Sequence, residues 1–144
     1  MNLPRHSVSV TGVVIRPEDG KVLIIKRMDD GRWVPPGGVL ELDETPEQCV
    51  VREVREETGI EVSPVRLVGV YKNMNLAVVS LALLCEPTGG EPKASSESSV
   101  VTWVTPAEAV ERCPEARGIR IQDALSMHGP HIRAHDGTFL LPSA

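Results

Sequence analysis

The stretch from Gly38 to Ile60, GVLELDETPEQCVVREVREETGI, decides the fold, because a short polar loop leads there into a strongly patterned helix. The tetrapeptide TPEQ at 45–48 is typical of a helix start. Its threonine suits the N-cap, its proline the first helical position, and its glutamine completes a capping box. Gly59 stands where a helix commonly ends. The sequence therefore predicts a helix over residues 46–58.

Three glutamates gather on one face of this helix. At about 100° per residue, Glu53, Glu56 and Glu57 fall within an arc of roughly 100° and within a single turn. An adjacent apolar flank, suited to the core, is formed by Val50, Val51 and Val54. Like charges at this spacing repel in an isolated helix, and a solvated face normally mixes both signs. Clustered carboxylates with no thiolate or histidine at the same spacing favour a hard cation such as Mg²⁺ or Mn²⁺ over zinc. A merely charged helix face is the alternative.

The same stretch resembles the Nudix box, written G-x5-E-x7-R-E-U-x-E-E-x-G-U with U aliphatic. Every specified position matches, at Gly38, Glu44, Arg52, Glu53, Val54, Glu56, Glu57, Gly59 and Ile60. The preceding segment WVPPGG at 33–38 also resembles the family's approach to the box. The resemblance implies an α/β (α+β) fold: a Nudix-type α/β/α sandwich with a mixed central sheet and the Nudix loop-helix. Residues 1–144 would form a single domain of this kind.

By this resemblance, Glu53, Glu56 and Glu57 ligate the metal, and either Glu53 or Glu56 also deprotonates the attacking water. Arg52 would hold a catalytic carboxylate in place, and Glu44 would restrain the entry from the loop into the helix. A diphosphate approaching several carboxylates needs cations, because the like charges would otherwise repel at short range. A bound cation also acidifies water and stabilises the charge on the leaving phosphate.

Two further groups of metal ligands are expected outside the helix. The backbone carbonyl of Gly37 or Gly38 is one, since glycine lets the main chain approach closely. Glu97 is the other: it lies six residues before Trp103, in a loop where some relatives place another metal ligand or the base. For Glu97 a solvated loop acid is the alternative reading.

Substrate contacts are predicted from residue type. The side chains that could meet phosphates are Arg27, Arg32 and Lys72. The side chains that could stack on or hydrogen-bond a base are Trp33, Tyr71, Asn73 and Asn75. For each of them an ordinary surface or core role is the preferred interpretation, and Trp33 is the first choice as a contact because it stands just before Gly37 and Gly38.

The remaining elements follow from composition and turn signals. The predicted strands are Ser7–Ile15, Lys21–Arg27, a short piece at Arg32–Val34, Val62–Val70, Leu76–Leu84 and Val100–Val104. The first two are expected to pair as a hairpin across Asp19-Gly20. Two further helices are predicted, from Thr105 to Arg112 and from Gly118 to Met127. The polar stretch Glu86–Ser99 is expected to be a loop, and the tail from His128 shows no period, so His131 and His135 are interpreted as ordinary tail residues.

Composition narrows the range of partners. A net charge of −5 argues against binding to polymeric nucleic acid or to an anionic membrane, both of which need a basic face. Three widely spaced cysteines without a CxxC motif indicate reduced thiols and a cytoplasmic setting. There is no signal-peptide pattern and no apolar stretch long enough to span a bilayer. A small-molecule nucleotide is the expected partner, and a homodimer is a further expectation, with Ser7–Ile15 as the first suspected interface.

The function implied by the resemblance is a pyrophosphohydrolase that cleaves a phosphoanhydride bond in a nucleoside diphosphate linked to another group. Such substrates include nucleoside triphosphates, and a nucleoside monophosphate is one product. ADP-ribose or nucleotide-sugar hydrolysis is an alternative, although no proline stands about fifteen residues past Ile60, where ADP-ribose hydrolases often have one. A non-catalytic nucleotide-binding regulator and an isoprenyl diphosphate isomerase are further alternatives, and the complete glutamate set argues against both.

Overall fold

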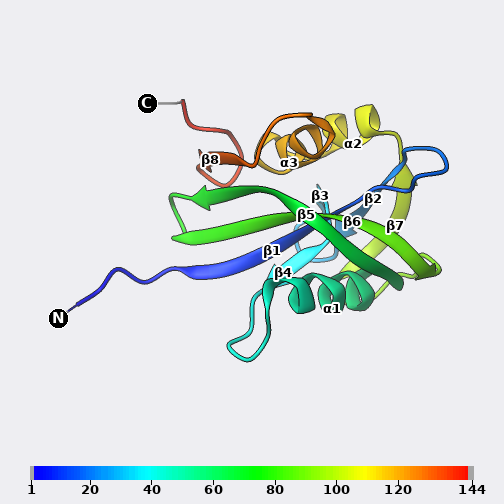
Figure 1. The fold of residues 1–144 in the computed structure, drawn as a ribbon, viewed down its shortest axis with the longest axis horizontal. Helices are drawn as coiled ribbons and strands as arrows, with labels where there is room; N and C mark the ends of the chain where they lie inside the picture. Colours follow the sequence, from blue (N-terminus) through cyan, green and yellow to red (C-terminus); the bar gives the residue numbers. More distant parts are fainter. Residues whose placement is uncertain (1, 143–144) are drawn as a thin grey trace.

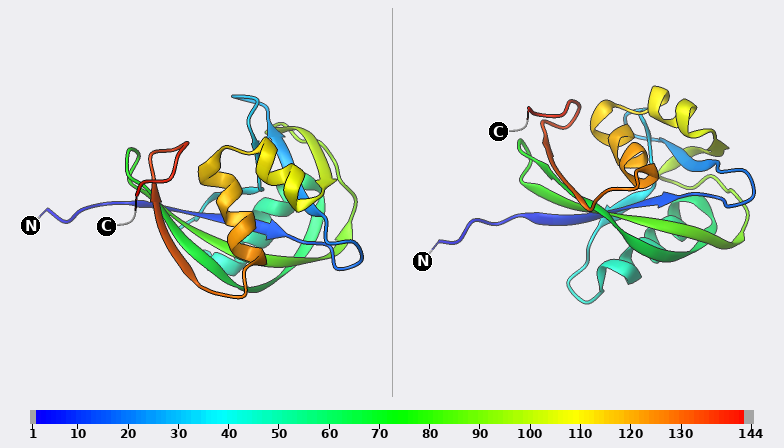
Figure 2. Two further views of the ribbon diagram at one scale, coloured as in Figure 1. Left: turned by 90° about the horizontal axis from the view of Figure 1, so that it is seen from above. Right: turned by 45° about the horizontal axis from the view of Figure 1, so that its top comes forward.

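The computed structural model describes residues 2–142 as an α/β/α sandwich. Helix α1 (Pro46–Thr58) covers one face of the β-structure, and α2 (Pro106–Arg112) and α3 (Glu115–Leu125) cover the other (Figure 1). Figure 2 shows α3 lying across the strands on the side opposite α1. The predicted layers are confirmed. Within residues 2–142, the helices are too short or too polar to cross a membrane.

The strands form two sheets within the described residues. Their bounds are β1 (Ser7–Val14), β2 (Val22–Arg27), β3 (Trp33–Val34), β4 (Gly37–Val39), β5 (Ile60–Asn73), β6 (Val78–Gly90), β7 (Ser98–Val104) and β8 (His131–His135). One sheet has five strands in the order β4-β1-β6-β5-β8, and the other has three in the order β3-β2-β7. In the larger sheet β1 runs parallel to β6 and β5 to β8, whereas β1–β4 and β5–β6 are antiparallel. The predicted mixed sheet is confirmed.

The core lies on both faces of the central sheet, as the alternation along β1 requires. Val13 faces the cluster beneath α2 and α3, whereas Val10 and Val14 face the cluster beneath α1. Gly12 lies opposite α1, where an added Cβ would come within 2.9 Å of a Val54 methyl group. The glycine therefore lets the helix carrying the glutamates pack close to the sheet.

Helix α1 begins and ends where the sequence predicts. The Thr45 hydroxyl accepts from the backbone of Gln48, and the Gln48 side chain accepts from the backbone of Thr45, which completes the capping box. Gly59 takes the left-handed conformation, with φ 79°, that ends a helix with little strain. Both ends of the helix are thus fixed by local sequence.

The predicted hairpin between the first two strands is wrong. β1 and β2 belong to different sheets and meet only beside the turn, at the bridge between Ile15 and Val22 and the bond from the Arg16 N–H to the Lys21 carbonyl. β1 instead pairs along all of its residues with β6, and on its other side with β4. β1 is therefore an inner strand of its sheet. The homodimer, with Ser7–Ile15 as its first suspected interface, stays a prediction. The outer strands of the five-stranded sheet are β4 and β8.

Two other segments differ from the prediction. β6 continues through Gly90 and pairs there with the start of β5, so only 91–97 of the polar stretch is loop. The tail contains β8, which pairs in parallel with Gly69–Asn73 of β5. His135 on β8 is buried, so its interpretation as an ordinary tail residue is wrong. β8 was not predicted because its pairing partner lies about sixty residues earlier, and periodicity over five residues is a weak signal.

The burial of His135 predicts a pH-dependent stability. Burial, followed by the charges of Arg120 and Arg117, lowers the pKa of His135 from 6.5 to about 4. Since the unfolded chain binds this proton more readily, its contribution to stability is present above pH 6.5 and is lost as the pH falls toward 4. The loss is expected to reach about 3 kcal/mol in the free energy of unfolding, from about 1.4 kcal/mol per pH unit.

Urea unfolding between pH 4 and pH 7 measures this change. The matched variant is His135→Asn, whose amide oxygen can still accept from Gly137, as His135 Nδ1 does at 3.0 Å. The variant should show a flatter pH dependence over this window. An equal slope in both proteins would mean that another group is responsible.

Candidate active site

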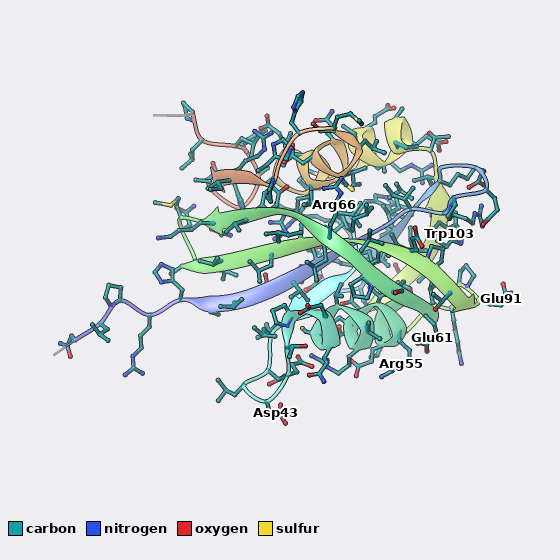
Figure 3. All side chains as sticks on the ribbon, in the orientation of Figure 1. Asp43, Arg55, Glu61, Arg66, Glu91 and Trp103 are labelled. Carbon is teal, nitrogen blue, oxygen red and sulfur yellow. The ribbon has the colours of Figure 1, made fainter. Side chains whose placement is uncertain are left out.

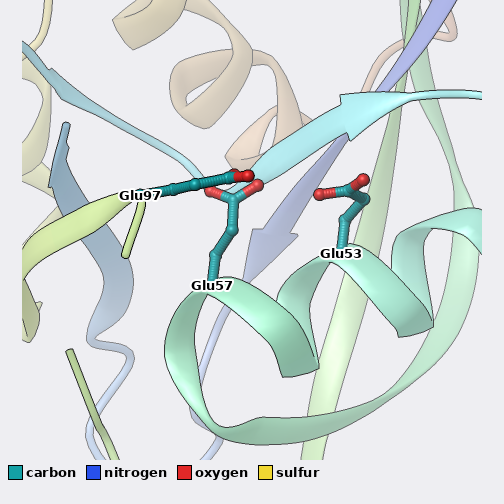
Figure 4. A group of neighbouring side chains, drawn as sticks. All are labelled: Glu53, Glu57 and Glu97. Carbon is teal, nitrogen blue, oxygen red and sulfur yellow. The ribbon is translucent and has the colours of Figure 1, made fainter. Parts of the chain in front are cut away.

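Three carboxylates converge at one point beside α1. Glu53 and Glu57 project from successive turns of α1, and Glu97 reaches them from the loop before β7 (Figure 4). One oxygen of each lies within 4.8 Å of the others. The loop is held in place because Met28 donates its backbone N–H to the carbonyl of Glu97 at 2.9 Å. These three residues are called the acidic wall below.

Within the acidic wall, Glu57 has the most perturbed environment. Its side chain is buried, and burial raises its pKa to about 9, with further contributions from a hydrogen bond to Glu53 and the charges of Glu53 and Glu97. The backbone N–H of Gly37 acts in the opposite direction. Three hard oxygen donors that repel one another and share one point fit a divalent cation, whose charge would relieve that repulsion.

Arg52 connects the acidic wall to the loop that precedes α1. Its guanidinium donates to both carboxylate oxygens of Glu44, at 3.0 and 2.6 Å, and to Glu53 at 2.8 Å. Glu44 also accepts from the backbone of Glu41, so it ties the loop to the helix. The Arg52 hydrogen bond lowers the pKa of Glu44 to about 2. The placement agrees with the roles that the resemblance implies for both residues.

Glu56 lies apart from this group. Its side chain is more than half exposed, and its carboxylate accepts from Arg52 at 3.2 Å. The structure therefore brings together Glu53, Glu57 and Glu97, whereas the sequence grouped Glu53 with Glu56 and Glu57. The difference arises because Glu56 and Glu57 are adjacent and diverge by about 100° around the helix.

The glycine loop passes directly over the acidic wall. A Cβ added at Gly38 would lie 2.4 Å from the carboxyl carbon of Glu53, and one at Gly37 would lie 2.1 Å from the carbonyl oxygen of Val10. Real Cβ atoms do not approach other atoms so closely, so β4 requires glycine at Gly37, where the neighbour is backbone, and glycine at Gly38 leaves the Glu53 carboxylate in place. The main chain thus comes as close to the carboxylates as the sequence predicts.

A pocket of about 800 Å³ opens above the acidic wall. It is lined by residues of β1, the end of β2, the glycine loop, α1, the loop before β7 and α3. This volume lies in the range of small-molecule sites. A shallower groove of about 320 Å³ on the outer side of α1 is lined by only one carboxylate residue, Glu47. The larger pocket is therefore the candidate active site.

Of the predicted substrate contacts, only Arg27 lines the pocket. Arg32, Trp33 and Lys72 do not. Trp33 packs against the core beneath α2, with the guanidinium of Arg112 5.2 Å from its ring centre.

Two of the predicted contacts are corrected by burial. Tyr71 is fully buried and donates its hydroxyl to Asp123 at 2.8 Å, so it is part of the core and not of the pocket. Asn73 is buried too, and its side-chain oxygen accepts from the backbone of Asn75 and Leu76. Both residues therefore stabilise the fold and are not available to a substrate.

Several pocket residues were not predicted from the sequence, and Arg117 is the one among them with a positive charge. Arg117 on α3 lines the pocket, yet the predicted third helix started only at Gly118. The three-residue spacing between Arg117 and Arg120 would place both on one face of a helix. The predicted helix began one residue after Arg117, so this spacing was not considered.

The comparisons with known proteins agree with this geometry. The NUDIX domain profile matches residues 6–123. A MutT-like protein of Streptomyces ambofaciens is 56% identical over 140 residues, which cover 97% of this chain and 90% of that protein. An ADP-ribose pyrophosphatase of Methanocaldococcus jannaschii is 36% identical over 99 residues, which cover 64% of this chain and 57% of that protein.

Solved structures support the same fold. A NUDIX hydrolase from Nitrosomonas europaea superposes with a TM-score of 0.80 at 20% identity, over 93% of this chain and 81% of that chain. An ADP-ribose pyrophosphatase from Streptococcus suis gives 0.71 at 23% identity, over 91% and 100%. At these identities the likeness shows the fold alone, whereas the profile and the sequence relatives show the family. The chain therefore belongs to the Nudix family and is a hydrolase of phosphoanhydride bonds in nucleotide-linked substrates.

Proposed function

We propose that this hydrolase uses Mg²⁺, with Mn²⁺ as a substitute, to cleave nucleoside diphosphates linked to a further group, and that it releases a nucleoside monophosphate. The observation that carries the proposal is the convergence of Glu53, Glu57 and Glu97 at the base of a nucleotide-sized pocket. Hard oxygen ligands of this number suit Mg²⁺. The three buried thiols are free, which supports action in the reducing cytoplasm. We also propose that residues 1–144 act as one domain.

In this proposal the acidic wall holds the cation, and the carbonyl of Gly37 or Gly38 adds a main-chain ligand. The bound cation would neutralise the phosphates and make water easier to deprotonate. Glu53 is our choice for the group that takes the proton, because it faces the pocket and Arg52 fixes its carboxylate at 2.8 Å. Glu56 is the alternative base; its carboxylate accepts from Arg52 at 3.2 Å, but it does not line the pocket.

Arg27 would bind a phosphate of the substrate. It lines the pocket at the end of β2, and its guanidinium donates to Asp29 at 3.0 Å through Nε and also through Nη2. That hydrogen bond, and the charges of Asp29, Asp30 and Glu57, raise the pKa of Arg27. The charge is therefore permanent, and Nη1, which donates to none of the described residues, can meet a phosphate oxygen.

A substrate panel tests the proposal. The panel holds canonical and oxidised nucleoside triphosphates, ADP-ribose, nucleotide sugars and dinucleoside polyphosphates, each assayed with Mg²⁺ and with EDTA for release of phosphate or pyrophosphate. Turnover that requires the cation is expected for at least one class. Glu53→Gln should lose more activity than Glu56→Gln if Glu53 is the base. Metal-dependent binding of a nucleotide without turnover of any member would instead support a non-catalytic regulator.

A further inference from the structure

A buried arginine on α3 touches one of the residues that line the pocket. Arg120 is fully buried, and none of the ion pairs among residues 2–142 includes it. The buried acid of the same helix, Asp123, accepts two hydrogen bonds from Arg133 and one from the hydroxyl of Tyr71. A buried charge without a counterion is costly, so the N–H groups of Arg120 need neutral acceptors.

The position of Arg120 is fixed by the packing of α3 on the central sheet. At the end of the helix, Arg66 of β5 donates to the carbonyl of Ala124 at 2.8 Å (Figure 3). The guanidinium of Arg120 itself lies 4.8 Å from the centre of the Tyr71 ring, also on β5. Arg120 therefore points into the sheet at a defined place.

Only two side chains among residues 2–142 can accept from Arg120. Its Nη1 donates to the hydroxyl of Thr11 at 2.6 Å and to that of Ser80 at 3.1 Å. Its Nη2 lies 3.4 Å from Nε2 of His135, but Nδ1 of that ring accepts from Gly137, so in the neutral ring Nε2 carries the proton. Its Nε has no partner. The two hydroxyls are thus the acceptors for this charge.

The protons of the two hydroxyls cannot both be satisfied inside the protein. A hydroxyl has one proton and two lone pairs, and Arg120, which only donates, occupies one lone pair of each. The oxygens of Thr11 and Ser80 lie 3.4 Å apart, so one can donate to the other. Within residues 2–142 neither hydroxyl has another acceptor. One of the two protons therefore needs an acceptor from outside the pair.

Burial decides which proton this is. Ser80 is 2% exposed and does not line the pocket, so its proton can go only to Thr11. Thr11 is 6% exposed and lines the pocket, as does Gly37, with which it pairs in register. Thr11 then accepts from both Arg120 and Ser80, which uses both of its lone pairs. It faces the pocket as a hydrogen-bond donor only.

We propose that the Thr11 hydroxyl donates a hydrogen bond to an oxygen of the substrate, and that Arg120 is the positioning residue that holds Thr11 as a donor. The inference rests on the proposed function, which makes this pocket the nucleotide site. The oxygen is either a keto oxygen of the base or a phosphate oxygen, since both accept. An amino group in the same place would oppose the Thr11 proton and leave two donors unpaired.

The test measures binding by calorimetric titration with Mg²⁺. The ligands are the α,β-methylene diphosphates of inosine, adenosine, uridine and cytidine, which resist cleavage between the two phosphates, together with methylenediphosphonate. Thr11→Val has nearly the shape of threonine but lacks the hydroxyl. It should weaken binding roughly fivefold to a hundredfold, the size expected when a buried acceptor loses its partner. Thr11→Ser keeps the hydroxyl and should keep most of the affinity.

The pattern of losses identifies the acceptor. If it is a keto oxygen, Thr11→Val should weaken the inosine and uridine analogues, and the adenosine and cytidine analogues should change less than about twofold. If it is a phosphate oxygen, all four analogues and methylenediphosphonate should weaken alike. Arg120→Met should give a smaller loss for the same ligands, because the hydroxyl remains but is no longer held. It should not lower the melting temperature, since it removes an uncompensated buried charge.

Thr102→Val is the matched control, because it makes the same change on β7, where Thr102 does not line the pocket. It should keep every wild-type affinity. Wild-type affinity of Thr11→Val for all ligands would overturn the proposal, and so would a loss that Thr11→Ser fails to restore. If no ligand bound the wild-type protein, the proposed function itself would be contradicted, and this inference with it.

Discussion

Replacing Glu57 by glutamine is expected to reduce kcat by at least about a hundredfold, the loss typical of removing a group that stabilises the reacting charges. Glutamine has the shape of the protonated acid but cannot supply the negative oxygen that a divalent cation requires. Glu57 is the most buried member of the acidic wall and lies one turn from Glu53, so no other carboxylate can take its position.

The same substitution should leave the metal-free fold intact. The pKa of Glu57, raised to about 9, means that the wild-type side chain is largely protonated at neutral pH when no cation is bound, and glutamine mimics that form. The melting temperature without metal should therefore match the wild type, and the increase produced by Mg²⁺ should disappear. Glu47→Gln, on the outer side of α1, is the control and should retain both turnover and the Mg²⁺ effect. Wild-type turnover in Glu57→Gln would show that the acidic wall is not the metal site.

The parts of the site that sequence predicts well are those fixed by local interactions. The capping box, the C-terminal glycine and the wheel position of Glu53 all depend on residues within one helix and its flanks. Arg52 and Glu44, for which the resemblance implied separate roles, lie only eight residues apart in the same segment and pair there. Such features need no knowledge of the rest of the chain.

The features that local sequence could not predict are those that depend on pairing between distant strands. Glu97 was expected as a ligand only through the resemblance, because its position beside α1 depends on two long-range contacts. These are the pairing of β7 with β2 and the bond from Met28 to the loop before β7. Tyr71 was misassigned because β5 contains three register shifts, and each shift breaks the alternation from which the buried face could be counted. β8 is defined by a parallel partner that local periodicity cannot reveal.

The glycine loop offers the second large effect, because its two glycines contact different kinds of atoms. An alanine Cβ at Gly38 would overlap the Glu53 carboxylate, with its carbon at 2.4 Å and both oxygens at 2.5 Å. Glu53 is a side chain and can move aside, so Gly38→Ala should fold with little loss of stability. Its carboxylate would then leave its position beside Arg52 and Glu57, and a displacement of about 1 Å in an active site costs about a hundredfold in kcat/KM.

Gly37→Ala separates this local effect from a loss of fold. At Gly37 the added Cβ would lie 2.1 Å from the backbone carbonyl of Val10, and backbone cannot move aside without opening the β1–β4 pairing. This variant should lose about 1–3 kcal/mol or more in the free energy of unfolding, along with activity. Melting curves and kcat/KM for both variants provide the measurement. If Gly38→Ala kept full activity at an unchanged melting temperature, the position of the Glu53 carboxylate seen here would not be the one that catalysis uses, and Glu56 would become the base to examine.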